Sequence, residues 1–228
     1  MIRFHFHPSP NPLKVALFLE ETGLPYELVP VDTRKGEQHA AAFRAINPNG
    51  KTPAIEDDGV AVFDSNAILL YLGEKTGRFL GAPSDRAQLL SWLMFVASGL
   101  GPFSGQAFHF KYVAPTEAYA ANRYNRETER HFRVLDDRLK TRTFIVGETY
   151  TIVDMAAWAW IGASDALLGE GGLASYPNLQ RWFDLVAARP AVARAKQVGA
   201  DIPFKQDLDD EALRALFPQN YPQVPAAA

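Results

Sequence analysis

The alternation of apolar and polar positions predicts a mixed α/β segment over residues 1–81. Short apolar runs bounded by turn residues indicate strands, whereas apolar positions three and four residues apart indicate helices. We expect these elements to form a four-stranded mixed sheet with helices between its strands. The expected elements are a strand at 2–7, a helix at 12–22, a strand at 27–31, a short helix at 38–45, a hairpin at 54–63 and a helix at 65–73.

Helical periods predominate after a linker at 81–85, whose Ser84 or Asp85 would cap the next helix. An all-helical domain is therefore expected at 86–199, and two glycines and a proline at 99–102 should bend its first helix. The expected helices cover 86–111, 116–140, 152–168, 178–188 and 191–198.

A tail at 200–228 follows, in which apolar residues stand among acidic ones. The stretch 207–217 predicts one amphipathic helix, which docks either on the rest of the chain or on a partner subunit. The last residues are expected to lack fixed structure.

Thr151 and Asp154 have the spacing of a helix capping box, with Tyr150 and Met155 placed as a hydrophobic staple. The helix that follows is apolar around most of its circumference. We therefore assign Thr151 and Asp154 to folding rather than to catalysis.

Composition narrows the possible functions. The 228 residues are 47% hydrophobic and 21% charged, as in ordinary globular proteins of one or two domains. A net charge of -3 argues against nucleic acid as a partner. No apolar run reaches the roughly 18 residues of a membrane span, and the N-terminus lacks a signal-peptide pattern, so we expect a cytoplasmic protein without membrane association.

The sequence contains no cysteine. Cysteine nucleophiles and thiolate zinc sites are therefore excluded, and any thiol chemistry needs a thiol that the ligand brings. His5 and His7 alternate on a predicted strand without a carboxylate at ligand spacing. We expect both to be solvent-facing or packed, and we expect no metal site.

The start of the predicted hairpin carries the first candidate binding feature. Pro53 follows Thr52 where the strand should begin. In one interpretation, Pro53 is the first residue of the strand, where a missing N–H costs nothing. In the other, the Thr52–Pro53 peptide bond is cis and turns the polar backbone groups of Thr52 toward an added peptide strand.

The end of the hairpin carries the second feature. Asp64 and Ser65 stand where a helix begins. They either cap that helix or form a ligand site, because the free N–H groups of a helix N-terminus attract a carboxylate and Asp64 could pair with an ammonium. The two features together suit a small peptide with an α-amino-acid head, so we expect the Thr52–Pro53 bond to be cis.

Five further motifs accompany the hairpin. They are Ser9-Pro10-Asn11, Leu17 to Glu21, Lys35 to Gln38, Ile68 to Gly77 and Gly99 to Pro102. Together with the hairpin, they resemble the glutathione transferase family, and the bacterial nu class in particular, over residues 1 to about 198. The resemblance implies the glutathione transferase fold, which is a thioredoxin-like N-terminal domain at 1–81 followed by an all-helical C-terminal domain at 86–199, and it implies a homodimer.

The N-terminus of the first predicted helix is the expected site of thiol activation. No tyrosine occurs in the first 25 residues, and Pro10 and Pro12 have no N–H. The Ser9 hydroxyl and the Asn11 amide and N–H are the remaining donors. The resemblance implies that Ser9 and Asn11 contact the sulfur of glutathione, although the pattern also fits an ordinary helix cap.

The resemblance also implies the other contacts with glutathione. The peptide's glycine end would lie at Gln38 and Lys51, its backbone at Thr52 and Pro53, and its γ-glutamyl group at Asp64 and Ser65. Arg130 would approach from the helical domain. It belongs to an arginine stripe with Arg123, Arg126 and Arg133, most of which is expected to be a solvated face paired with Glu127 and Glu129. The expected walls of the second-substrate pocket are Phe103, Gln106 and Phe108.

Two functions from different classes remain. The leading one is an enzyme that ionises glutathione, at one or two molecules per site, and uses it to reduce a small disulfide or attack an electrophile. The other is a non-catalytic module that keeps the glutathione transferase fold for binding or scaffolding.

Overall fold

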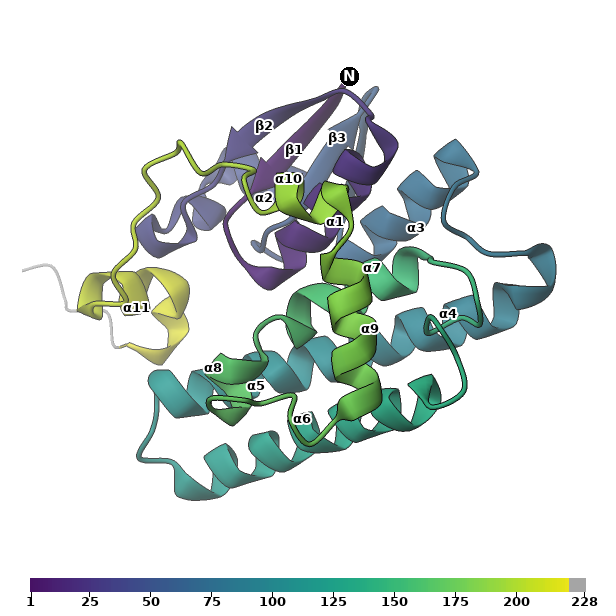
Figure 1. Cartoon of the computed structure of the whole chain (residues 1–228). Helices are drawn as coiled ribbons and strands as arrows, with labels where there is room; N and C mark the ends of the chain where they lie inside the picture. The colour runs from purple at the N-terminus through teal and green to yellow at the C-terminus, as the bar shows by residue number, and fades with distance from the viewer. Residues whose placement is uncertain (222–228) are drawn as a thin grey trace, which may run out of the picture. The chain divides into compact units, whose positions relative to one another are not determined.

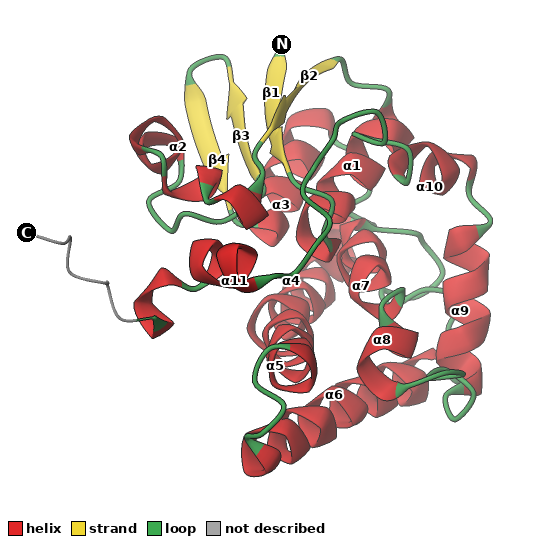
Figure 2. Ribbon diagram, turned by 90° about the vertical axis from the view of Figure 1, so that its left-hand side faces the viewer, coloured by secondary structure: helices red, strands yellow, loops and turns green. Residues whose placement is uncertain are grey.

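The computed structural model describes residues 1–221 and contains a four-stranded sheet in the order β2-β1-β3-β4 (Figures 1 and 2). β1 (Ile2–Phe6) runs parallel to β2 (Tyr26–Pro30) and antiparallel to β3 (Ala54–Asp57), which pairs with β4 (Val60–Phe63). The mixed sheet expected from the sequence is confirmed.

The hairpin turn is also confirmed. Asp58 and Gly59 connect β3 and β4 and have φ angles of 50° and 85°. These left-handed values suit glycine and are tolerated by aspartate, which explains why this dipeptide turns the chain here.

The chain divides into two compact units. One consists of residues 1–8, 25–64 and the described tail from 199, and the other of residues 9–24 and 65–198. In the first unit, Phe4, His5 and Phe6 of β1 are buried, and so is His7 directly after the strand, so both histidines are packed rather than solvent-facing. The second unit buries a larger helical core that includes Phe18, Leu69, Leu89, Phe132, Met155 and Trp182.

Helices form the whole regular structure of the second unit. In Figure 1, α5 and α6 lie side by side. The helices are α1 (Pro10–Thr22), α3 (Ser65–Thr76), α4 (Arg86–Phe95), α5 (Gly101–Tyr112), α6 (Ala118–Leu139), α7 (Ile152–Ile161), α8 (Ser164–Leu168), α9 (Pro177–Ala187) and α10 (Pro190–Ala195).

Two local expectations for this unit are wrong. The single helix expected at 152–168 is divided into α7 and α8, because Gly162 and Ala163 form a turn between them. Asp85 makes no side-chain cap on α4. Its carboxylate instead accepts a hydrogen bond from Ala82 N at 3.0 Å, within a short 3₁₀ turn at Pro83–Asp85.

The expected bend near residues 99–102 is a π-helical turn, Val96–Leu100, between α4 and α5. Such turns insert an extra residue into a helix and often mark functional positions. A β-carbon at Gly99 would collide with the His131 ring. The absence of a side chain at Gly99 therefore lets His131 of α6 approach this turn closely.

The capping box at the start of α7 is confirmed. Asp154 is fully buried, and its carboxylate accepts hydrogen bonds from Thr151 N at 2.8 Å and Ile145 N at 3.0 Å. It also accepts from the indole of Trp182 at 2.9 Å. One carboxylate thus joins the start of α7, the loop before it and α9.

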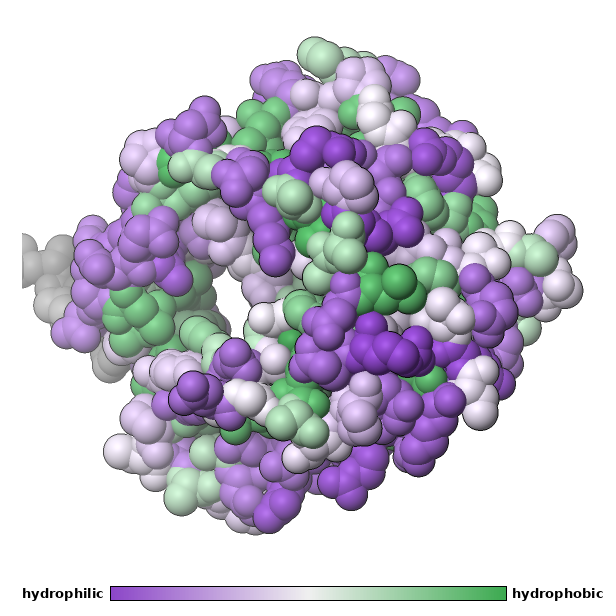
Figure 3. Space-filling view, viewed as in Figure 1, coloured by the Kyte–Doolittle hydropathy of each residue, from purple (hydrophilic) through white to green (hydrophobic). Residues whose placement is uncertain are grey.

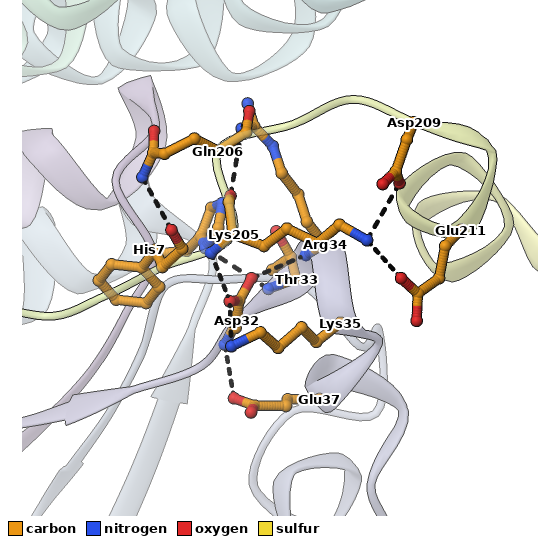
Figure 4. Close-up of polar contacts among 11 residues, drawn as sticks. His7, Asp32, Thr33, Arg34, Lys35, Glu37, Lys205, Gln206, Asp209 and Glu211 are labelled. Carbon is orange, nitrogen blue, oxygen red and sulfur yellow. Dashed lines mark hydrogen bonds and ion pairs between the residues drawn. The ribbon is translucent and has the colours of Figure 1, made fainter.

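The tail docks on the chain's own first unit. Its helix α11 (Asp210–Leu216) lies against the loop between β2 and the short helix α2 (Ala41–Ile46). This loop contains two 3₁₀ turns, Thr33–Lys35 and Glu37–His39. Figure 4 shows Lys205 N donating to Asp32 at 2.8 Å. The expectation for the last residues concerns 222–228, which lie outside the described range.

The visible face in Figure 3 is mostly hydrophilic, with small hydrophobic patches between the polar residues. Within residues 1–221, no helix is both long enough and apolar enough to cross a membrane.

Candidate functional site

In the first unit, the strand register brings two predicted ligand positions to the same end of the hairpin. Ala54 pairs with Phe63, so Pro53 and Asp64 flank one cross-strand pair. The Thr52–Pro53 peptide bond is cis, as expected from the sequence. The backbone of Thr52 and the carboxylate of Asp64 therefore belong to the same end of the hairpin.

Asp64 has an unusual backbone. Its φ angle is 71°, which few residues other than glycine adopt, although aspartate and asparagine do so more readily than most. Its side chain is exposed. Residues other than glycine that adopt a left-handed backbone often occur at ligand-binding positions. Here the residue is an aspartate, and it comes directly before α3.

The turn before β3 is held by Asn47. The buried Asn47 amide accepts a hydrogen bond from Asn49 N at 3.0 Å and donates one to Lys51 O at 2.5 Å. The Lys51 side chain is exposed. A β-carbon at Gly50 would lie 3.3 Å from Gln38 O, so this turn packs against the backbone of Gln38.

Gln38 is more enclosed than the sequence indicates. Only 4% of its surface is exposed, and its Nε2 donates to Ala215 O of α11 at 3.0 Å. Its Oε1 is buried without a hydrogen-bond partner among the described residues. His39 also contacts Ala215 O, at 2.9 Å from Nε2. The tail helix therefore covers the loop to which the sequence assigns the glycine end of a ligand.

In the second unit, the start of α1 carries the two residues expected to contact sulfur. Ser9 is the N-cap residue, but its hydroxyl makes no capping hydrogen bond. Pro10 and Pro12 contribute no N–H groups at this helix end. The hydroxyl of Ser9 is thus not used in the way that an ordinary helix cap would use it.

The Asn11 amide has a partner from a distant part of the same unit. Its Oδ1 accepts a hydrogen bond from Trp160 Nε1 of α7 at 3.0 Å. Both side chains are half-buried. An indole N–H only donates, so the carbonyl end of the amide must face Trp160 and the NH2 end must face away.

Ser65 begins α3 and contacts a buried lysine. Lys14 of α1 is 1% exposed, and its Nζ donates to Ser65 Oγ at 3.2 Å. The hydroxyl hydrogen of Ser65 therefore remains a donor. Lys14 thereby links the start of α3 to α1.

Arg130 is fixed on α6 by two neighbours. Its Nη2 lies 2.9 Å from Glu127 Oε2 and 3.3 Å from His131 Nε2. His131 Nδ1 lies 2.6 Å from Glu127 O, so this nitrogen carries the proton and Nε2 accepts from Arg130. Burial lowers the pKa of His131, which favours this neutral form. The expected pairing of the arginine stripe is confirmed for Arg123, which contacts Glu127 at 3.1 Å, and for Arg126, which contacts Glu129 at 3.2 Å.

The three expected pocket residues lie on α5 in different surroundings. The Phe103 ring packs against α6, with centroid distances of 5.2 Å to His131 and 6.2 Å to Tyr124. Phe108 is 40% exposed, and Gln106 is exposed. Within residues 1–221, no group of three or more His, Asp or Glu side chains could hold a metal ion.

Sequence reasoning missed two residues that contact the candidate site. Lys14 is the one charged residue in the apolar run 12–19, and this was the available signal for a buried cation. Trp160 belongs to an almost wholly apolar helix, and nothing in the sequence distinguishes it from a core residue.

The chain is similar to known proteins over most of its length. Two family models match the chain, "Glutathione S-transferase, N-terminal domain" over residues 8–75 and "Glutathione S-transferase, C-terminal domain" over residues 100–190. The disulfide-bond oxidoreductase YfcG of Escherichia coli is 44% identical over 204 residues, which are 86% of this chain and 94% of the relative.

Two solved structures share the fold. A glutathione transferase of Burkholderia graminis, with two glutathione molecules bound per subunit, has a TM-score of 0.80 and 36% identity, and the match covers 86% of this chain and 87% of that one. A glutathione transferase of Pseudomonas putida, with one glutathione disulfide bound per subunit, has a TM-score of 0.79 and 34% identity, with coverages of 89% and 91%. The chain belongs to the glutathione S-transferase family and has that family's fold, a thioredoxin-like N-terminal domain followed by a helical C-terminal domain.

Proposed function

We propose that this protein is an enzyme that binds glutathione, ionises its thiol and uses it to reduce small disulfides. The observation that carries the proposal is the position of Thr52 and Asp64 at one end of the hairpin, beside the paired residues Ala54 and Phe63. This arrangement suits a peptide that has both a backbone to pair and an ammonium group to bind. Glutathione has both.

The ligand's ends are assigned by charge. The γ-glutamyl ammonium pairs with Asp64, and the neighbouring carboxylate binds at Ser65 and the N-terminus of α3. The cysteinyl backbone pairs with the backbone of Thr52 beside Pro53. The glycine carboxylate binds Lys51, and Gln38 shapes this end through its contact with Gly50.

Thiol activation is assigned to the start of α1. A free thiol has a pKa of about 8.5, so only a few per cent of it is thiolate at neutral pH. Lowering this pKa by one to two units requires about 1.4 to 2.7 kcal/mol of stabilisation of the anion. Directed hydrogen bonds from Ser9 and Asn11 are of sufficient strength.

The reaction uses two glutathione molecules, because the chain has no cysteine to form a mixed disulfide. The thiolate of the first attacks one sulfur of the substrate disulfide, forms a glutathione–substrate disulfide and releases the other half as a thiolate. The thiolate of the second attacks the glutathione sulfur, giving glutathione disulfide and the second product thiolate. Each glutathione gives up one proton, and the two protons neutralise the two product thiolates.

Arg130 and the pocket residues complete the proposed site. Arg130 offsets the carboxylate charge when two glutathione molecules are bound, and the two molecules per subunit in the Burkholderia graminis structure support this stoichiometry. Phe103, Gln106 and Phe108 line the pocket for the second substrate, which is either a disulfide or an electrophile that accepts the thiolate. A nu-class assignment, a homodimer and a cytoplasmic location belong to the same proposal.

The direct test measures glutathione disulfide formed by the purified protein from glutathione and a small symmetric disulfide. We expect turnover well above the uncatalysed rate. Glutathione binding by calorimetry without turnover of disulfides or electrophiles would favour the scaffolding alternative instead.

Replacing Asp64 with asparagine should raise the KM for glutathione about tenfold and change kcat less, because a charge-assisted hydrogen bond to the ammonium is lost. Asparagine tolerates the φ angle of 71°, so the backbone is preserved. The matched control is Asp58→Asn at the opposite end of the same hairpin, where φ is 50°. An unchanged KM in Asp64→Asn would mean that the amino-acid head of glutathione binds elsewhere.

A further inference from the structure

The hydrogen bond between Trp160 and Asn11 fixes which end of the Asn11 amide is available to a ligand. The two residues are 149 positions apart and are joined by the 3.0 Å contact from Nε1 to Oδ1. An asparagine amide has a donor end and an acceptor end of nearly the same shape. A partner that can only donate or only accept a hydrogen bond therefore favours one of the two orientations of the amide. An indole N–H can only donate.

α5 leaves space for the indole. A β-carbon at Gly101 would lie 3.0 Å from Trp160 Nε1, and one at Gly105 would lie 3.6 Å from its ring carbon Cη2. The two glycines are one helical turn apart and therefore on the same face of α5. Glycine weakens a helix interior, and here two of them occur where the Trp160 ring lies.

We propose that Trp160 is a positioning residue, which holds the Asn11 amide with its NH2 group toward the thiolate of glutathione. This inference rests on the proposed function of Asn11. The NH2 end offers two donors to an anion, whereas the Oδ1 end would offer only lone pairs and would repel it. Without the indole N–H, both orientations become accessible and the average stabilisation of the thiolate falls.

The test is the variant Trp160→Phe, which keeps an aromatic ring between the glycines and removes the N–H. Ultraviolet absorbance of the bound thiolate, followed over pH, gives the pKa of the glutathione thiol. We expect this pKa to rise toward the value of about 8.5 of a free thiol. Turnover at neutral pH should fall about five- to tenfold, while the KM for glutathione changes less than about twofold.

The matched control is Trp158→Phe on the same helix. Trp158 is 2% exposed, and its Nε1 has no hydrogen-bond partner among the described residues. This variant loses an indole of the same kind, but it should leave the thiol pKa unchanged. Denaturant unfolding of both variants shows whether they are equally folded.

A double variant separates positioning from general damage. Trp160→Phe should shift the thiol pKa in the wild-type background and cause no further shift in Asn11→Ala, because the amide that it orients is already absent. An unshifted pKa in Trp160→Phe, or an equal further shift in the Asn11→Ala background, would overturn the inference.

The same experiment distinguishes this inference from the proposed function. A wild-type protein that neither binds glutathione nor lowers its thiol pKa would overturn both. An active wild-type protein whose thiol pKa is unaffected by Trp160→Phe would overturn only the role of Trp160.

Discussion

Replacing Asp154 with alanine is expected to lower the free energy of unfolding by about 3 to 5 kcal/mol, the range for removing one partner of a buried charged interaction. The carboxylate is 0% exposed and accepts from Ile145 N, Thr151 N and Trp182 Nε1 at 2.8 to 3.0 Å. Alanine leaves these three buried donors without an acceptor. Each unsatisfied donor costs about 1 to 3 kcal/mol, and partial relaxation keeps the total below their sum.

Chemical denaturation of the wild type and the variant measures this effect. The control is Asp184→Ala in α9, whose exposed carboxylate contacts Gln180 Nε2 on the helix surface at 2.9 Å. It should change the free energy of unfolding by less than about 0.5 kcal/mol. A similar small change in Asp154→Ala would show that the loop, α7 and α9 do not depend on the carboxylate.

The titration of Asp154 also predicts how the free energy of unfolding changes with pH. Burial raises its pKa from 3.8 to about 6, so between these values the native state binds more protons than the unfolded state. Its titration therefore contributes stability that is complete below 3.8 and is lost as the pH rises to about 6. The free energy of unfolding of the wild type, relative to that of the non-titrating Asp154→Asn variant, should fall over this interval and then become constant.

Replacing Asn11 with alanine is expected to reduce the turnover of disulfide reduction about 10²-fold, the lower range for removing a donor to a developing or bound anion. The amide supplies two donors at a helix end where Pro10 and Pro12 supply none. The pKa of the bound thiol should rise toward about 8.5. Ser9→Ala should have a smaller effect, because a hydroxyl offers one donor.

Ultraviolet titration of the bound thiolate in the two variants tests this order. Asn122→Ala, at an exposed position of α6, serves as the control and should leave both turnover and the thiol pKa unchanged. If Asn11→Ala did not alter the thiol pKa, Asn11 would have a structural role at the start of α1, and Ser9 would become the leading candidate for thiol activation.

The turns and helix ends were predictable because their interactions are local. The Asp58–Gly59 turn, the left-handed Gly23 that ends α1 and the capping box of Thr151 and Asp154 each connect residues within a few positions of one another. Their geometry depends on backbone sterics and on side chains that bond to the backbone a few residues away. Both follow from the residue types at neighbouring positions.

The candidate ligand positions were only partly predictable. The register of β3 and β4 follows from the hairpin turn, so the sequence could predict that Pro53 and Asp64 lie close to each other. The enclosure of Gln38 could not be, because its partner Ala215 lies 177 positions away in a tail helix with two possible docking partners.

The family, the mixed sheet, the helical segment after it and the residue types that suit glutathione could all be predicted from the sequence. The distant side chains that contact these residues, such as Lys14 at Ser65 and Trp160 at Asn11, became known only from the folded chain. The pattern of apolar residues shows that α1 and α7 have buried faces. It does not show which helices pack against each other, because many arrangements bury the same faces. The polar contacts of those faces are fixed only when the helices pack in one particular arrangement, because a hydrogen bond tolerates an error of less than about 1 Å.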